Sequence, residues 1–143
     1  MKSRLRQDLV SGDWIVISPG RAKRPEQQIK KLEKRKKAPK NGCPFEDPQK
    51  NTGKKPILIY DSGKKWEIQV IENKYPAFTP RKVCPVFSKN GPYQAVDAVG
   101  YHELVITKDH DANFADLSKN AARRVFEVFR DRYLMLLNDK CLH

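Results

Sequence analysis

One amphipathic segment near the C-terminus constrains the fold of this 143-residue chain more than any other feature. Over residues 117–138, apolar side chains recur at helical spacing, which predicts a long helix with one apolar face. The stripe includes Leu117, Ala121, Val125, Val128, Phe129 and Leu136. Either Asp116 or Ser118 is placed to cap the start of this helix. It is the only strongly predicted helix.

Short runs rich in β-branched and aromatic residues predict strands before that helix. These runs are DWIVIS (13–18), PILIYD (56–61), KWEIQVIEN (65–73) and GYHELVIT (100–107). The turn DSGK between the second and third runs indicates a β-hairpin. Strands followed by one helix predict an α+β fold, with a mostly antiparallel sheet covered by a helix layer. Residues 74–94 contain four prolines and are expected to be irregular.

The composition limits the class of protein. Hydrophobic residues make up 38% of the chain and charged residues 32%, and the length fits one domain over residues 1–143. The sequence contains neither an apolar run long enough to span a membrane nor a secretory leader, so we expect a cytoplasmic protein without a membrane partner. Three widely spaced cysteines argue against a disulfide framework and fit a reducing compartment.

The chain is strongly basic, with a net charge of +12 at pH 7. Part of the excess lies in KKLEKRKKAPK (30–40), within a basic loop predicted over residues 26–42. Such a run is typical of a solvated loop. A basic balance also fits binding of nucleic acid or of a smaller phosphorylated substrate, and the charge alone does not separate these alternatives.

The segment SPGRAKRP (18–25) is the first candidate site, because it places Arg21, Lys23 and Arg24 in a turn after a predicted strand. A guanidinium group offers a fork of donors that matches phosphate oxygens. A solvated basic turn is the alternative interpretation.

The chain also contains several potential metal ligands, which are Cys43, Glu46, Cys84, His102, His110, Cys141 and His143. Structural zinc usually takes about four ligands, two of them close in sequence. No Cys-x-x-Cys pair is present, since Glu46 stands three residues after Cys43. Cys84 is more simply interpreted as a small buried hydrophobic residue, and His102 as a core or surface histidine.

The segment VIENKYPAF (70–78) is the third candidate, with Asn73 directly after a predicted strand and Tyr75, Pro76 and Phe78 close behind. An amide beside aromatic rings can bind a nucleotide base. The alternative, which composition favours, is that Asn73 caps a turn while the rings join the core. The sequence contains no Gly-x-Ser-x-Gly motif, P-loop or dinucleotide fingerprint.

Taken in order, these segments resemble the N-terminal half of galactose-1-phosphate uridylyltransferases. The resemblance is carried by LRQDLVSGDWIVISPGRAKRP, CPFEDP, VIENKYPAF and GYHELVITKDHDANFADLS, and it covers nearly the whole chain. It implies the N-terminal half only of a histidine-triad-like fold, an antiparallel half-barrel with one long packed helix. It further implies exchange of UMP between UDP-glucose and galactose 1-phosphate, a hexose 1-phosphate, through a uridylylated histidine.

The resemblance also implies roles for single residues. Arg21, Lys23 and Arg24 match the residues that hold the nucleotide phosphates, and Asn73 matches a residue near the uridine. Cys43 and His110 match two ligands of a structural zinc, with Glu46 where the family has a second cysteine.

The chain departs from the family pattern at the catalytic motif. The His-Pro-His motif of the family is absent, so we expect a portion of a longer enzyme that is inactive alone and lacks the fourth zinc ligand. Two alternatives stay open: a related adenylyltransferase or dinucleoside-polyphosphate phosphorylase, and a non-catalytic basic nucleic-acid-binding module, which is the less favoured. Homodimerisation is expected, because a half-barrel exposes a sheet edge.

Overall fold

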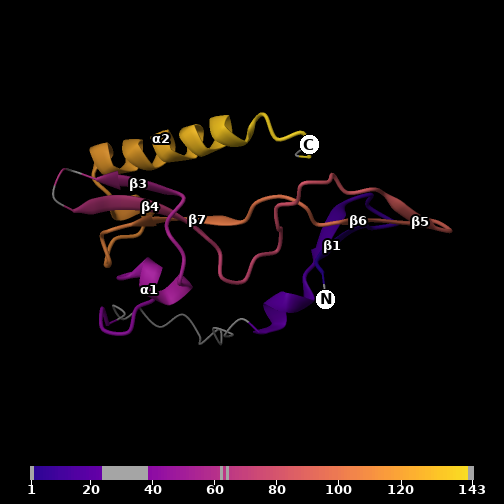
Figure 1. The fold of residues 1–143 in the computed structure, drawn as a ribbon, viewed down its shortest axis with the longest axis horizontal. Coiled ribbons are helices and arrows are strands. Elements are labelled where there is room, and N and C mark those ends of the chain that lie inside the picture. Colours follow the sequence, from indigo (N-terminus) through magenta and orange to yellow (C-terminus); the bar gives the residue numbers. More distant parts are fainter. Residues whose placement is uncertain (1, 24–38, 62, 64, 142–143) are drawn as a thin grey trace. The chain divides into compact units, whose positions relative to one another are not determined.

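The computed structural model describes residues 2–23, 39–61, 63 and 65–141 (Figure 1). Its internal contacts divide the chain into two units. Unit 1 comprises Met1–Glu26, Asn73–His102 and Leu136–His143, and unit 2 comprises Gln27–Glu72 and Glu103–Met135. Each unit has its own antiparallel sheet.

Unit 2 is built on a three-stranded sheet in the order β3-β4-β7, with α2 against one face (Figure 1). The elements are β3 (Leu58–Asp61), β4 (Trp66–Glu72), β7 (Glu103–Thr107) and α2 (Lys119–Leu136). Both strand pairs are antiparallel, so the predicted hairpin of β3 and β4 is confirmed. The predicted helix is confirmed as well, and it is two residues shorter at each end than expected.

The core of unit 2 lies between its sheet and α2. Ile68 and Val70 of β4 alternate onto the face that meets Val125 and Val128, and these four side chains form one buried cluster. The opposite face of β4 is buried too, since Gln69 is only 2% exposed. Its side chain is hydrogen-bonded to Gln49 of the short helix α1 (Pro48–Thr52), which lies on that side of the sheet (Figure 1).

The start of α2 is capped by Ser118. Its hydroxyl accepts the backbone N–H of Ala121 at 3.2 Å. Asp116, the other candidate, instead completes a capping box with Asn113 around the 3-10 turn η2 (Phe114–Asp116). The local pattern therefore predicted the helix start correctly, and the side-chain geometry selects between the two caps.

Unit 1 contains a four-stranded antiparallel sheet in the order β2-β1-β6-β5. Its strands are β1 (Arg4–Gln7), β2 (Trp14–Ile17), β5 (Ser88–Asn90) and β6 (Tyr93–Asp97), and β2 leads into the 3-10 turn η1 (Pro19–Lys23). The strand predicted over residues 13–18 is confirmed as β2. The sheet brings the N-terminal hairpin beside residues about ninety positions away in sequence, since Arg4 pairs with Asp97.

Part of the segment that was predicted to be irregular forms a hairpin. Residues 88–90 and 93–97 are paired as β5 and β6, and Gly91 joins them with a φ of +58°. That backbone conformation suits glycine in a tight two-residue turn. The prediction failed because all four prolines of this segment lie outside the paired residues, three of them before β5 and Pro92 in the turn itself.

The prediction against disulfides was wrong. Cys84 and Cys141, 57 residues apart, form a disulfide. Cys84 is also exposed, so it is not the small buried hydrophobic residue that its sequence context suggested. The spacing of cysteines could not reveal this pair, because only the tertiary fold brings such distant residues together. Cys43 is the free cysteine among the described residues.

The fold class is therefore α+β, as predicted, with two antiparallel sheets and one main helix. The strands are divided between two sheets, a feature that the linear pattern did not indicate. Within the described parts of the chain, no helix is both long enough and apolar enough to cross a membrane.

Candidate functional site

Asn73 and His102 organise the turn that carries the NKYPA segment. The side-chain oxygen of Asn73 accepts the backbone N–H of Tyr75 at 2.9 Å, and Nδ1 of His102 accepts that of Ala77 at 2.9 Å. The two residues also contact each other, with the Asn73 amide nitrogen 3.0 Å from Nε2 of His102. Asn73 therefore does cap a turn, and His102 is a half-buried histidine with polar partners on both ring nitrogens.

Arg21 joins the basic turn to this segment. It lies in η1, is half-buried, and its Nη1 donates a hydrogen bond to the carbonyl oxygen of Tyr75 at 2.9 Å. The structure thus brings Arg21 next to the turn that Asn73 caps. The resemblance assigned both residues to one nucleotide site. The Lys23 side chain and all of Arg24 lie outside the described residues.

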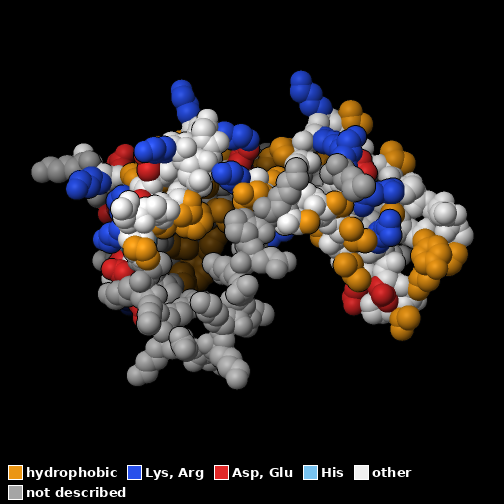
Figure 2. Space-filling model, turned by 90° about the horizontal axis from the view of Figure 1, so that it is seen from below, with side chains coloured by type: hydrophobic (Ala, Val, Ile, Leu, Met, Phe, Trp, Pro, Cys, Tyr) orange, Lys and Arg blue, Asp and Glu red, His pale blue; other side chains and the backbone are white. Residues whose placement is uncertain are grey.

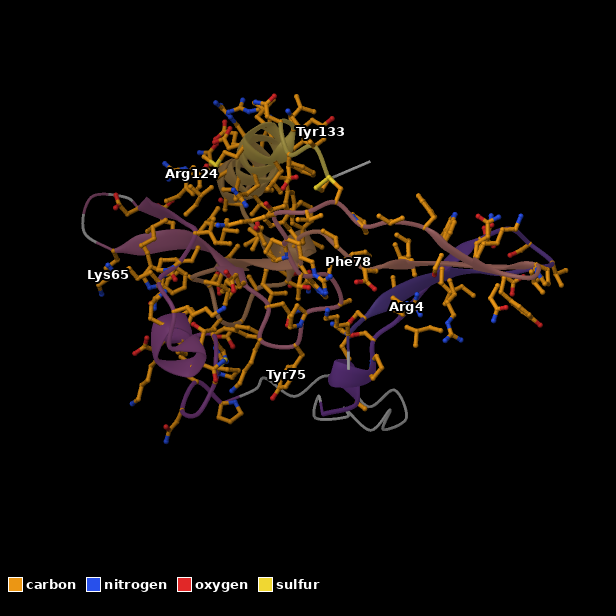
Figure 3. All side chains as sticks on the ribbon, turned by 45° about the vertical axis from the view of Figure 1, so that its right-hand side comes forward. Arg4, Lys65, Tyr75, Phe78, Arg124 and Tyr133 are labelled. Carbon is orange, nitrogen blue, oxygen red and sulfur yellow. A yellow bond between two sulfur atoms is a disulfide. The ribbon has the colours of Figure 1, made fainter. Side chains whose placement is uncertain are left out.

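A cavity of about 430 Å³ in unit 1 opens beside these groups. It is lined by Lys2, Ser3, Gly20, Lys74, Tyr75, Pro76, Thr79, Arg81 and Ala98. Three of these residues are cationic and none of them is acidic, so the cavity is a basic hollow with one aromatic ring in its wall. Tyr75 and Phe78 project from the same irregular segment (Figure 3).

One acidic residue nearby balances part of that charge. Arg81 Nη1 lies 2.9 Å from Asp97 Oδ2, and Arg4 Nε lies 3.8 Å from Asp97 Oδ1. Lys2 and Lys74 are exposed. Lysine and arginine side chains are spread widely over the face of the molecule that Figure 2 shows. The cavity therefore differs from the rest of this basic surface because it is concave and all of its charged lining residues are cationic.

Sequence inspection missed Lys2, Lys74 and Arg81 as candidate binding residues. Lys74 directly follows Asn73, and that adjacency was the one available signal. Lys2 and Arg81 lie far from each other in sequence, and only the pairing of β1 with β6 brings their surroundings together.

A second cavity, of about 500 Å³, lies in unit 2 at the start of α2. Its wall combines acidic Glu67, Asp109 and Asp116 with basic Lys108 and Arg124. Arg124 is paired with Glu67, and Lys108 lies 4.5 Å from the centre of the Trp66 ring. Because these charges largely offset one another, this cavity is a weaker candidate for an anionic ligand.

The predicted zinc ligands lie in unit 2. Glu46 Oε1 is 2.8 Å from His110 Nδ1, and the His110 side chain is only 7% exposed. Cys43 lies on the same turn as Glu46, since the Glu46 N–H donates to the Cys43 carbonyl oxygen at 3.3 Å. The structure thus unites Glu46 and His110, as a metal site would require.

The donor set is nevertheless incomplete. Over the described ranges of the chain, no group of three or more His, Cys, Asp and Glu side chains is arranged to hold a metal ion. Of the other candidates, Cys84 and Cys141 are joined to each other, and His143 lies outside the described residues. The described residues therefore do not form a zinc site by themselves, and zinc binding stays a prediction.

Comparison with solved structures identifies the class of fold. No family model matches the chain. A solved structure of a uridylyltransferase superposes with a TM-score of 0.50 and 26% sequence identity, covering 90% of this chain and 35% of that one. The α+β arrangement of antiparallel sheets with one main helix is thus the arrangement seen in a uridylyltransferase.

Among curated proteins, the chain is similar to ADP-glucose phosphorylase of Arabidopsis thaliana, with 28% identity over 131 residues. The match covers 90% of this chain and 37% of that protein, so the chain spans little more than a third of the relative's length. Together the two similarities indicate a nucleotidyltransferase-type enzyme family. They do not distinguish a galactose-1-phosphate uridylyltransferase from other such enzymes.

Proposed function

We propose that this chain is the N-terminal portion of a nucleotidyltransferase and that it binds a nucleotide-sugar in the basic cavity of unit 1. The observation that carries the proposal is the convergence of Lys2, Lys74 and Arg81 on one hollow beside Tyr75. A nucleotide-sugar carries a diphosphate, whose charge Lys2 and Lys74 can balance, while Arg81, which is paired with Asp97, has further N–H donors to offer. It also carries a base and a sugar, which can pack against an aromatic ring.

In the preferred form of this proposal, the whole enzyme exchanges UMP between UDP-glucose and galactose 1-phosphate. The similarity to a uridylyltransferase structure supports uridine as the base. The histidine that would carry the UMP belongs to a His-Pro-His motif, which is not among these 143 residues. What this chain contributes is therefore binding and charge balance rather than the nucleophile.

A second candidate substrate is ADP-glucose. It is favoured by the similarity to an ADP-glucose phosphorylase, whose name states both an adenine nucleotide and a phosphorolytic reaction. This candidate belongs to the alternative of an adenylyl-transferring or phosphorolytic relative of the same fold. The two candidates share the diphosphate and the glucose, so they differ at the base.

Separate titrations of the two candidate substrates distinguish between them. UDP-glucose and ADP-glucose are titrated into the chain by calorimetry, and the tighter ligand identifies the base. Lys74→Met and Arg21→Met are expected to weaken binding about tenfold each, the effect of removing one charge-assisted contact or its support. Arg123→Met, at an exposed helix position of unit 2, is the matched control and is expected to bind as the unaltered chain does. Absence of binding by both ligands would overturn the proposal.

Binding of nucleic acid is the remaining alternative, through the basic segment 30–40, which lies outside the described residues, and the Arg21–Arg24 turn. A nucleic-acid ligand would show affinity that falls steeply with salt, because many counterions are released. A nucleotide-sugar should give a shallow salt dependence, since it carries two phosphates. The same titrations at two salt concentrations therefore decide between the two classes of ligand.

Zinc at Cys43, Glu46 and His110, homodimerisation and a cytoplasmic location also remain proposals. The Glu46–His110 contact supports the first, and it requires further donors. Elemental analysis of the purified chain, with Cys43→Ser for comparison, tests the metal. The mass in solution tests the dimer. The disulfide fits a reducing cytoplasm only if it is transient or redox-sensing, as most cytosolic disulfides are.

A further inference from the structure

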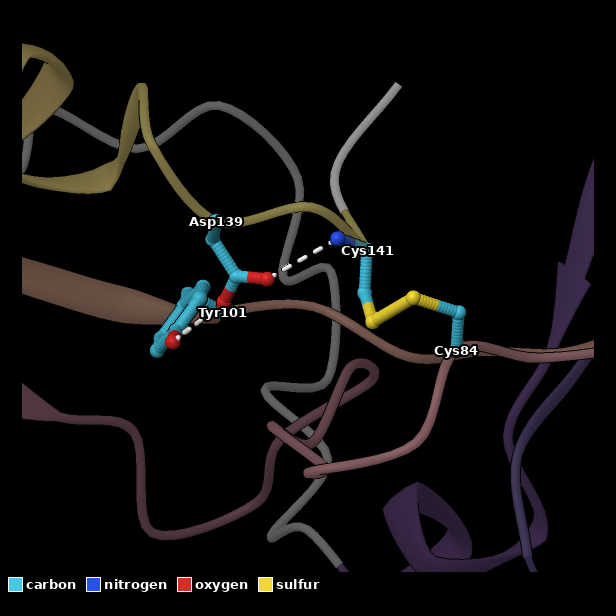
Figure 4. Close-up of a disulfide and its surroundings, with 4 residues drawn as sticks. All are labelled: Cys84, Tyr101, Asp139 and Cys141. Carbon is cyan, nitrogen blue, oxygen red and sulfur yellow. Dashed lines mark hydrogen bonds between the residues drawn. A yellow bond between two sulfur atoms is a disulfide. The ribbon is translucent and has the colours of Figure 1, made fainter.

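The disulfide ties the wall of the basic cavity to the segment that follows α2 (Figure 4). Cys84 comes three residues after Arg81, which lines the cavity. Cys141 comes five residues after the end of α2. Both cysteines belong to unit 1, the unit that holds the candidate site, and the chain between them includes residues 103–135 of unit 2.

The partner segment is itself held in place by Asp139. One carboxylate oxygen of Asp139 accepts the backbone N–H of Cys141 at 2.9 Å, and the other accepts the Tyr101 hydroxyl at 2.8 Å (Figure 4). Tyr101 is followed directly by His102, the residue that supports the Asn73 turn. Cys84 is therefore joined to a segment that is hydrogen-bonded to Tyr101, the residue next to His102.

The stretch around Cys84 is otherwise poorly covered. Val83 is 76% exposed, Val86 84% and Phe87 63%. Upstream, the backbone is fixed at Thr79, whose N–H donates to Ala98 and whose carbonyl oxygen accepts the N–H of Gly100. Between Thr79 and β5, the stretch is also held by the Arg81–Asp97 ion pair and by the contact of the Phe87 ring with Trp14. The disulfide adds a covalent tie to this stretch, which has little buried surface.

Access to the bond is consistent with reversible chemistry. Cys84 is exposed and Cys141 half-buried, so a thiol can approach the Cys84 sulfur from solvent. Thiol–disulfide exchange needs such access for the attacking thiolate. A disulfide enclosed in a core would lack it.

We propose that Cys84–Cys141 is a reversible, redox-sensitive disulfide, called here the redox clasp. It limits the conformations of residues 80–87, which include Arg81 in the cavity wall, and thereby sets the affinity of the basic cavity for its anionic ligand. The ligand part of this inference rests on the proposed function, and the clasp itself does not. In the oxidised form the wall is held in the binding arrangement. In the reduced form residues 80–87 sample more conformations, so a smaller fraction of molecules presents Arg81 to the ligand.

The chemistry requires a dithiol reductant. One thiolate of the reductant attacks the Cys84 sulfur, which breaks the Cys84–Cys141 bond, forms a mixed disulfide and releases Cys141 as a thiolate that takes up a proton. The second reductant thiolate then attacks its own sulfur in the mixed disulfide and releases Cys84. Two electrons and two protons pass to the protein, and the reductant leaves as a cyclic disulfide.

Hydrogen exchange tests the clasp independently of any ligand. The 143-residue chain is compared in its oxidised form and after reduction by dithiothreitol with alkylation of the freed thiols. The amides of Thr79, Gly100 and Cys141, which are hydrogen-bonded in the segments beside the disulfide, are expected to exchange faster in the reduced form, while those of α2 within unit 2 stay unchanged. Equal exchange of these three amides in the two forms would overturn the proposal.

Nucleotide titration tests the consequence for the cavity. UDP-glucose is expected to bind the reduced chain about threefold to tenfold more weakly than the oxidised chain. Cys84→Ser and Cys141→Ser should bind like the reduced chain whether or not reductant is present, and Arg123→Met, at an exposed helix position of unit 2, should respond as the unaltered chain does. Faster exchange with unchanged affinity would overturn the control of the cavity. If neither form binds, the proposed function fails, and exchange alone decides the clasp.

Discussion

The side-chain amide nitrogen of Asn73 lies 3.0 Å from Nε2 of His102, while the other ring nitrogen accepts the N–H of Ala77. Asn73 and His102 are 29 residues apart and come from the ends of two segments that converge in unit 1. Their contact fixes the turn that carries Tyr75, and Arg21 donates to the carbonyl of that same tyrosine. The candidate site is thus assembled from three separate parts of the chain.

Replacing His102 should therefore destabilise the turn. His102→Phe keeps a ring of similar size but leaves the Ala77 N–H without its acceptor, and we expect a loss of about 1–3 kcal/mol in the free energy of unfolding. Urea denaturation measures the loss. Lys89→Ala, at an exposed position of β5, is the control and should change stability by less than about 0.5 kcal/mol. Equal stabilities for the two variants would show that the His102 contacts are not formed in solution.

The helix α2 offers a comparison between its two faces. Val128 is fully buried against the sheet of unit 2, whereas Phe126 on the other side is 60% exposed. Val128→Ala removes two buried methyl groups and should cost about 2 kcal/mol, including the cavity it leaves. Phe126→Ala should cost much less despite removing more atoms. Thermal or urea unfolding measures both, and a large effect at Phe126 would mean that this face is covered in solution.

Glu103 and Arg132 form a two-point ion pair in unit 2. Arg132 Nε lies 2.8 Å from Glu103 Oε2 and Nη2 lies 2.6 Å from Oε1, with side chains only 15% and 12% exposed. Arg132→Met leaves a poorly hydrated carboxylate, so we expect a loss of about 1–3 kcal/mol.

The double variant provides the control for that ion pair. Glu103→Gln combined with Arg132→Met should lose less stability than the sum of the two single losses, because the second change no longer breaks a contact. A double-mutant cycle from urea unfolding measures this coupling. If the two losses were strictly additive, the Glu103–Arg132 ion pair would not be formed in solution.

The disulfide should stabilise the chain by restricting the unfolded state. It closes a loop of 57 residues, and removing it by Cys84→Ser is expected to cost about 2–4 kcal/mol. Denaturation under non-reducing conditions measures the cost, and Cys141→Ser should give the same result. Lys89→Ala, at an exposed position of β5, is again the control. A stability that dithiothreitol leaves unchanged would argue that the bond does not form.

We expect Asp139 to contribute to the loss of stability of unit 1 at acidic pH. The hydrogen bond from the Cys141 backbone N–H, and then that from the Tyr101 hydroxyl, lower the pKa of its carboxyl group below 3.8. Because the pKa is lower in the folded state, the stabilisation is present above the unfolded pKa and is lost as pH falls through the folded pKa. Asp139→Asn should reduce the loss of stability below about pH 4, measured by urea unfolding at several pH values. An unchanged pH profile would exclude this contribution.

Local sequence determined the regular elements of this protein. The apolar stripe of α2 and the runs of β2, β3, β4 and β7 were all predicted, because helical spacing and runs of β-branched and aromatic residues can be recognised within each segment alone. The turn at Asn73 and the two possible helix caps, Ser118 and Asp116, were also recognised from neighbouring residues alone. The resemblance to uridylyltransferases also rested on contiguous motifs, and it agrees with the solved structure at the level of the fold.

Tertiary structure decided the features that depend on distant pairs. β1 was not predicted, since its residues RLRQ are mostly polar and gain strand geometry by pairing with β2 and with β6, about ninety residues away. The tertiary fold likewise gathers Lys2, Lys74 and Arg81 at one cavity and brings Cys84 to Cys141. Local periodicity reports which way a side chain faces along its own element, but it holds no information on which distant element lies opposite.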